Sequence, residues 1–104
     1  MDLRGHLDLL LLATLRHTGP THGYALIAAL RERSGGAFDL PEGTVYPALH
    51  RLERGGLLAS HWSDQTGRRR RIYAVTDRGR AALAQQRQDW STFATAVRAV
   101  VAEA

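Results

Sequence analysis

The sequence predicts a mostly α-helical protein with one small β-hairpin. Three observations support this fold class: four segments have helical patterns of apolar residues, two short segments near the middle have β character, and a polar turn joins those two. The length of 104 residues allows one domain with a modest hydrophobic core.

The first helix is predicted over residues 7–17, which are rich in leucine. Apolar side chains point in nearly every direction around its axis, so the helix is expected to be buried on more than one side. In so short a chain this favours packing against a second subunit as well as against its own domain, with Leu7 and Leu11 in the contact.

The second helix is predicted to begin at the capping residue Thr21 and to run to about residue 33. Its inward-facing side chains are expected to be Tyr24, Ile27 and Leu30. His22 is interpreted as a residue that caps or packs rather than one that binds a ligand.

The third helix is predicted over residues 41–54, where one apolar stripe is expected to face the core. The stripe consists of Val45, Ala48, Leu49 and Leu52. Pro47 removes a backbone donor, so the helix is expected either to kink there or to begin later, with Thr44 as its cap.

Residues 57–63 and 68–75 are predicted strands, joined by turn residues 64–67. The second strand opens with the four arginines Arg68, Arg69, Arg70 and Arg71. Because neighbours on a strand point to opposite faces, at least two of the four must be solvated. Trp62 is expected to fill the space between the hairpin and the helices.

The last helix is predicted from the capping residue Thr76 to the C-terminus. Its apolar residues repeat every seven positions, with one polar interruption at Gln86. The repeat consists of Leu83, Trp90, Val97 and Ala104, with Phe93 and Val100 at the offset positions. Exposed apolar patches normally mark an interface, so residues 77–104 are predicted to form a dimerisation helix.

Three helices followed by a hairpin describe a winged helix-turn-helix, which is expected to occupy residues 1–76 and to form one compact unit with the last helix. In that fold the third helix enters the major groove of DNA, and the hairpin, called the wing, lies beside the duplex. The predicted DNA contacts are the four wing arginines together with Gly43, Thr44, Tyr46, Pro47, His50 and Arg51.

The distribution of charge favours a polyanionic partner. All 14 basic residues are arginine, and the formal net charge is +4. Residues 41–80 carry eight arginines against four acidic residues, whereas residues 1–40 and 81–104 are each neutral. The whole net charge therefore lies in the middle of the chain, as expected for a nucleic-acid-binding surface.

Composition argues against other classes of function. The absence of cysteine excludes disulfides and thiolate metal sites, and five scattered histidines lack the paired spacing of metal ligands. No catalytic set of nucleophile, base and acid is visible, so neither an enzyme nor a cofactor is expected. No apolar run reaches the ~18 residues of a membrane span, and no signal peptide is evident, so the chain is expected to be cytoplasmic.

Taken together, these motifs resemble the PadR-like family of transcriptional regulators over about residues 5–100. The matching segments are residues 22–24, 43–49 and 52–57, the strand with Trp62, the arginine-rich wing, and Thr76 with Gly79. The short C-terminal helix is similar to the smaller branch of that family. Ile72 departs from the pattern, because the family usually has an aromatic residue there.

The resemblance implies a homodimeric repressor whose two recognition helices read a palindromic operator in double-stranded DNA. It also implies release from DNA by a small aromatic or lipophilic effector near the dimer interface, where Trp90 is the candidate residue. The alternative is a winged-helix module that binds RNA or a protein partner without recognising an operator.

Overall fold

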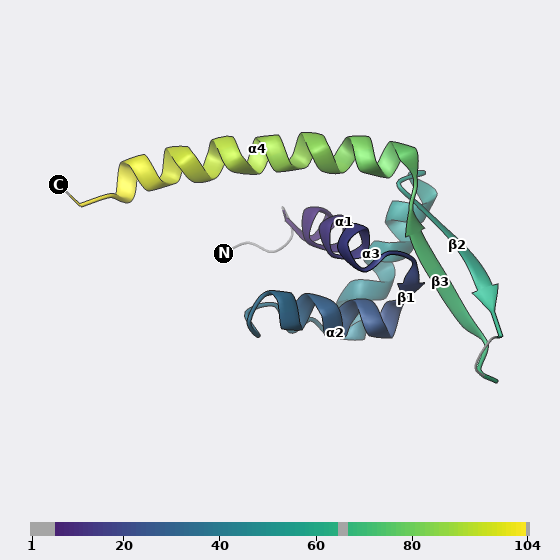
Figure 1. Ribbon diagram of the computed structural model, residues 1–104. Helices are drawn as coiled ribbons and strands as arrows, with labels where there is room; N and C mark the ends of the chain where they lie inside the picture. The colour runs from purple at the N-terminus through teal and green to yellow at the C-terminus, as the bar shows by residue number, and fades with distance from the viewer. Residues whose placement is uncertain (1–5, 65–66, 104) are drawn as a thin grey trace.

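The computed structural model describes residues 6–64 and 67–103 and confirms the predicted mostly α-helical fold (Figure 1). The elements are α1 (Leu7–Thr18), β1 (Thr21–His22), α2 (Gly23–Arg33), α3 (Glu42–Arg54), β2 (Leu58–Ser63), β3 (Arg70–Val75) and α4 (Asp77–Val101). The hairpin of β2 and β3 is the wing, and α3 is the helix predicted to enter the major groove.

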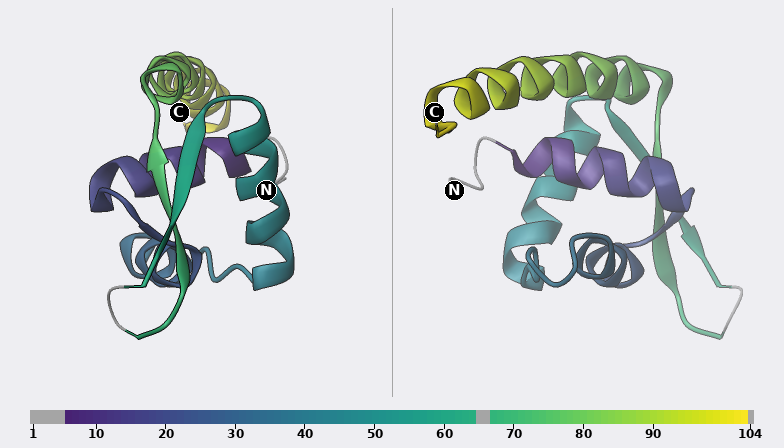
Figure 2. Two further views of the ribbon diagram at one scale, coloured as in Figure 1. Left: turned by 90° about the vertical axis from the view of Figure 1, so that its right-hand side faces the viewer. Right: turned by 60° about the vertical axis from the view of Figure 1, so that its left-hand side comes forward.

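The strands form an antiparallel sheet in the order β1-β3-β2. β3 is central, and Trp62 of β2 lies opposite Arg71 while β1 places Thr21 opposite Tyr73. The sequence did not predict β1, because two residues are too few to show alternation. This short strand joins the start of α2 to the middle of β3 (Figure 2).

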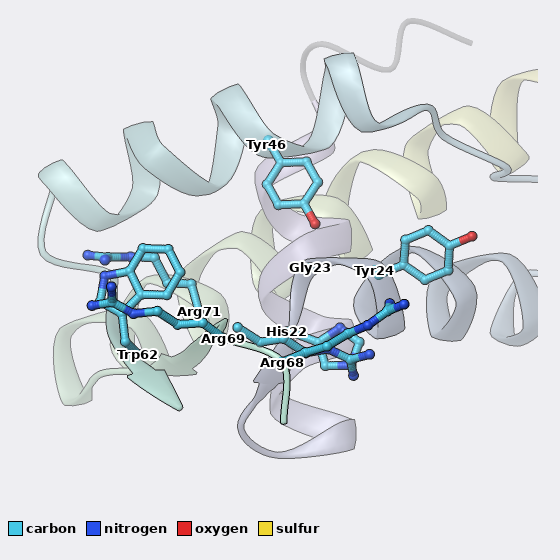
Figure 3. A pocket seen from close by; sticks show the side chains of 9 residues that line it. His22, Gly23, Tyr24, Tyr46, Trp62, Arg68, Arg69 and Arg71 are labelled. Atoms are coloured by element: carbon cyan, nitrogen blue, oxygen red, sulfur yellow. The ribbon is translucent and has the colours of Figure 1, made fainter. Parts of the chain in front are cut away.

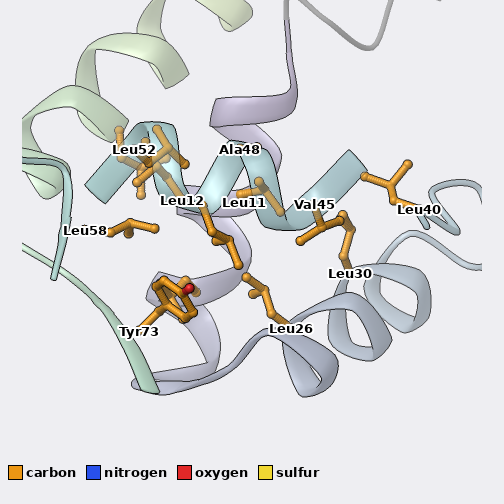
Figure 4. Close-up of a cluster of buried hydrophobic side chains, with 13 residues drawn as sticks. Leu11, Leu12, Leu26, Leu30, Leu40, Val45, Ala48, Leu52, Leu58 and Tyr73 are labelled. Atoms are coloured by element: carbon orange, nitrogen blue, oxygen red, sulfur yellow. The ribbon is translucent and has the colours of Figure 1, made fainter. Parts of the chain in front are cut away.

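The hydrophobic core gathers around α1 (Figure 4). The buried apolar residues are Leu11, Leu12, Leu15, Leu26, Leu30, Leu40, Val45, Ala48, Leu49, Leu52, Leu58, Tyr73 and Leu83. Leu11 and Leu83 are thus buried within one chain and have no surface left for a partner, which corrects their predicted place in a dimer contact. Tyr24, predicted to face inward, is 67% exposed, and Leu26 takes the inward position.

Two helix starts differ from the prediction. α2 begins after His22, whose Nδ1 accepts a hydrogen bond from the Ala25 amide at 3.2 Å, so His22 rather than Thr21 is the cap. α3 begins at Glu42 and runs through Pro47, so Thr44 lies inside the helix rather than at its cap. Because proline lacks an amide proton, the carbonyl four residues earlier loses its usual helical donor there.

The joint between the wing and α4 depends on a capping residue and a glycine. Thr76 Oγ1 accepts from the Gly79 amide at 3.0 Å, which confirms Thr76 as the predicted cap. A Cβ atom at Gly79 would collide with the carbonyl oxygen of Leu57. Gly79 therefore lets the first turn of α4 lie directly against the chain that leads into β2.

From this joint α4 crosses α1 and continues past the rest of the domain (Figure 1). Its outer part exposes an apolar stripe that consists of Trp90, Phe93, Val97, Val100 and Val101. The predicted repeat also includes Ala104, which lies outside the described residues. In the described ranges, no helix combines the length and the apolar character that a membrane crossing requires.

Candidate nucleic-acid interface

The start of α2, one side of α3 and the wing border an open groove of about 620 Å³ (Figure 3). Its lining residues are His22, Gly23, Tyr24, Tyr46, Trp62, Arg68, Arg69, Arg70 and Arg71. The fold therefore brings Tyr46 together with the four arginines of the wing. The remaining predicted contacts lie on the adjacent outer face of α3.

The apolar stripe of α3 packs into the core, so the opposite, outer face of the helix is polar and open to solvent. The exposed residues are Glu42, Gly43, Thr44, Pro47, His50, Arg51 and Arg54. Arg54 was not among the predicted contacts, although it lies eleven residues after Gly43 and so about three turns along the same face. Helical periodicity would have found it.

The first turn of α3 leaves backbone donors available. Its N-cap is Pro41, whose side chain cannot accept a hydrogen bond. The amides of Thr44 and Val45 both donate to the Pro41 carbonyl. The preceding amides of Glu42 and Gly43 have no partner within the helix. A Cβ at Gly43 would meet no atom within 4 Å, so open space surrounds this backbone. Such a helix start favours an anion.

Tyr46 joins α3 to the start of α2. A Cβ at Gly23 would lie 2.7 Å from its ring, so only glycine lets the ring pack here. Figure 3 shows the Tyr46 hydroxyl directed towards Gly23 on the groove side of α3. Burial, and then the charge of Glu42, raise the pKa of Tyr46, so at neutral pH the hydroxyl keeps its proton and can donate to an acceptor.

Arg71 is held by groups of the protein itself. Its Nε donates to Ser60 Oγ at 2.7 Å, and its Nη2 lies 3.5 Å from Glu53 Oε2 on α3. Ser60 Oγ in turn donates to the same Glu53 oxygen at 2.5 Å. Glu53 of α3 therefore compensates the charge of Arg71 on β3.

Trp62 is 51% exposed and does not fill the space between wing and helices, which corrects the prediction. The Arg69 guanidinium lies 4.7 Å from the centre of the indole, and that of Arg71 lies 5.2 Å from it. Cation–π attraction thus keeps this large ring at the surface beside the groove.

Arg70 faces His22, with 2.9 Å between Nη1 and Nε2. Burial, and then the charge of Arg70, lower the pKa of His22, so its imidazole is neutral at neutral pH. A neutral imidazole has one acceptor nitrogen, so it can accept from the Ala25 amide or from Arg70, but not from both. An anion that drew Arg70 away would leave the cap of α2 undisturbed.

The other arginines near α3 have different surroundings. Arg51 pairs with Asp8 of α1, so in this structure a predicted DNA contact is joined to the first helix. In contrast, Arg68, Arg69 and Arg70 form no ion pair with any acidic side chain of the described residues. Three uncompensated cations therefore line one groove beside a helix start that favours anions.

The family described as the transcriptional regulator PadR-like family matches residues 11–85, which is more than half of the chain. The chain belongs to the PadR-like family of transcriptional regulators. The four helices and the wing are accordingly those of a PadR-like winged-helix regulator, and the groove described above lies between its third helix and its wing.

Relatives agree with this assignment. The PadR-like chain is 47% identical over 58 residues to transcriptional regulator Rv3488 of Mycobacterium tuberculosis, a segment that covers 56% of this chain and 54% of that protein. The chain thus spans about half the length of this curated relative. Its fold matches a transcriptional regulator from Clostridium thermocellum with a TM-score of 0.86 and 27% identity, covering 95% of this chain and 96% of the other.

A PadR family transcriptional regulator from Eggerthella lenta is also similar, with a TM-score of 0.84 and 33% identity. That match covers 97% of this chain and 86% of the other. The likeness therefore includes the C-terminal helix as well as the winged-helix domain of this PadR-like protein.

Proposed function

We propose that this PadR-like regulator is a repressor that binds a palindromic operator in double-stranded DNA as a homodimer. The observation that carries the proposal is the groove in which Arg68, Arg69 and Arg70 lack acidic partners in the described residues, next to the exposed face of α3. A duplex that takes α3 into its major groove would bring its phosphates to these arginines.

The proposed interface has one set of groups that contacts phosphates and another that contacts bases. Wing arginines, the Tyr46 hydroxyl and the amides near Gly43 suit phosphate oxygens, which fix orientation but carry no sequence information directly. Thr44 and His50 project from the exposed face of α3 and suit base edges. Arg51 can contact a base only if its ion pair with Asp8 breaks.

A second copy of the chain is the proposed partner of α4. Trp90 is 38% exposed and Phe93 56% exposed, and the stripe continues through Val97 to Val100. Two copies joined through these stripes bury apolar surface that a lone domain leaves in water. Such a pair is symmetric, so its recognition helices suit palindromic half-sites about one helical turn, or 34 Å, apart.

Trp90 is also the proposed contact for a small aromatic or lipophilic effector. A hollow of about 320 Å³ lies between α1 and α4, and Trp90 and Phe93 form its aromatic wall. Ring centroids of Trp90 and His6 lie 4.9 Å apart at 84°, so an edge-to-face contact already occupies one side of the indole.

Selection of bound fragments from the source genome tests the operator directly. We expect the protein to enrich duplexes with an inverted repeat, and Thr44→Ala to relax the preference without a large loss of affinity for unrelated DNA. Duplex RNA of equal length is the control, because its narrow major groove does not admit α3. Equal binding to RNA, or enrichment without a shared repeat, would contradict operator recognition.

A further inference from the structure

The indole of Trp62 has an unusual position for so large an apolar group. It stays half exposed, and two guanidinium groups are in contact with it, one from Arg71 on β3 and one from Arg69, which comes just before β3. Trp62 of β2 lies directly opposite Arg71 of β3, so these two side chains share a face of the hairpin. The ring therefore connects Arg71, near the outer end of the strand pairing, with Arg69 at the tip of the wing.

The contacts of Trp62 continue to α3. Arg71 touches the indole and also binds Ser60 and Glu53, the latter a residue of α3. Glu53 accepts from Ser60 as well, which fixes the carboxylate against the middle of β2. A continuous series of polar and stacking contacts thus runs from α3 through Arg71 and Trp62 to Arg69.

We propose that Glu53, Arg71 and Trp62 form a strut that positions Arg69 for the DNA backbone, and that Arg71 itself does not bind DNA. The proposal rests on the DNA-binding function proposed above. It replaces the interpretation of the four wing arginines as equivalent contacts. Arg71 is a positioning residue whose charge Glu53 compensates, whereas Arg69 lacks an acidic partner among the described residues.

Stacking is well suited to this role. A guanidinium that lies over an aromatic ring keeps its N–H donors directed outward in its own plane, where phosphate oxygens can accept from them. The ring also restricts the rotamers of a long side chain before DNA arrives, which lowers the entropy lost on binding. Arg68 provides an internal comparison, because it is exposed and forms no cation–π contact within the described residues.

A double-mutant cycle on duplex affinity tests the strut in the full-length protein. We expect Trp62→Leu to weaken binding about two- to five-fold per subunit, the loss typical of one exposed cation–π contact. In an Arg69→Ala background the effect of Trp62→Leu should disappear. In an Arg68→Ala background it should persist in full, and equal effects in both backgrounds would overturn the proposal.

Salt dependence separates Arg69 from Arg71. Arg69→Ala should reduce the slope of log affinity against log salt by about 0.9 per subunit, the value for one lost phosphate contact. The charge-balanced pair Glu53→Gln with Arg71→Gln should weaken binding and leave the slope unchanged. If the double variant Glu53→Gln with Arg71→Gln loses as much slope as Arg69→Ala does, Arg71 contacts phosphate and the proposed strut is wrong.

Two controls keep the outcomes separable. Trp62→Phe retains a ring, so it should recover part of the affinity that Trp62→Leu loses, and it replaces Trp62→Leu if that variant does not fold. Failure of the wild-type protein to bind any duplex would overturn the proposed function. Tight, salt-sensitive binding with an additive Trp62–Arg69 cycle would overturn the strut alone.

Discussion

The groove beside the wing and the outer half of α4 expose opposite chemistry from one small domain. In the groove, four arginines accompany Trp62 and Tyr46, and two of them lie over the Trp62 indole. Along α4, Trp90 and Phe93 are exposed on a stripe whose other members are valines. Both regions expose aromatic rings, but in the groove Trp62 holds guanidinium groups, whereas on α4 Trp90 and Phe93 lie beside one another.

Because the two surfaces differ in chemistry, salt should weaken DNA binding at the groove but not association through the apolar stripe of α4. Arginine contacts to phosphate weaken as salt rises, because counterions released into a more concentrated solution gain less entropy. Apolar association does not weaken in this way, and sulfate or phosphate salts strengthen it. The two proposed interactions of this protein can therefore be separated by solution conditions before any residue is changed.

The largest expected effect comes from a charge placed in the apolar stripe. Trp90→Arg should dissociate the dimer, because an unpaired buried charge costs about 3–5 kcal/mol. Light scattering gives the mass directly. Gln88→Arg is the matched control, because it adds the same charge two residues away on the exposed opposite side of α4. A Trp90→Arg protein that stays dimeric would place the interface elsewhere.

The next largest effect lies at the joint that connects the two regions. Gly79→Ala should lower the free energy of unfolding by about 3 kcal/mol, because its Cβ meets the Leu57 carbonyl, a backbone atom that cannot swing aside. Chemical denaturation measures the loss. Gly43→Ala is the paired substitution, because the space around Gly43 is open.

We expect Gly43→Ala to raise the free energy of unfolding by about 0.5–1 kcal/mol, since alanine favours the helix. The same variant should weaken DNA binding, because its methyl group lies where phosphate would approach the backbone. A protein that is both more stable and a stronger DNA binder would contradict the assignment of this helix start to the interface.

The smallest expected effect concerns His22 and pH. Its pKa is lowered from 6.5 in the folded protein, by burial first and Arg70 second, so the unfolded chain binds more protons just below that pH. Stability should therefore be complete above about pH 6.5 and fall as the pH drops through the lowered pKa. Protonation also removes the acceptor that caps α2.

Thermal unfolding at about pH 7.5 and about pH 5.5 measures this loss in the wild type and in His22→Asn. Asparagine caps helices well and does not titrate, so the variant should lose less stability on acidification. An equal loss in both proteins would assign the acid sensitivity to other groups.

Local sequence patterns were sufficient to predict most of the fold. The stripe from Val45 to Leu52 and the cap at Thr76 depend on residues close together in the chain, and both are where the sequence places them. Tyr24 was misjudged because it and Leu26 both offer an apolar side chain near the core. Only the tertiary packing decides between them.

The site was less predictable, because its organisation depends on pairs that are distant in sequence. The four arginines of the wing are identical in type, and nothing local shows that Glu53 binds Arg71 or that Asp8 binds Arg51. Trp62 was expected to be buried because it is large and apolar, yet two guanidinium groups hold it at the surface. Ion pairs between different helices and strands leave no periodic pattern in the sequence from which they could be predicted.

The measurement that tests the central claim most directly is the salt dependence of affinity for the selected duplex. The triple variant of Arg68, Arg69 and Arg70 to alanine should flatten the log–log slope by about 0.9 for each arginine in each subunit. Replacement of Arg87 and Arg98, which lie on α4, should leave the slope unchanged. Equal slopes for the wild type and the triple variant would show that the wing does not contact DNA.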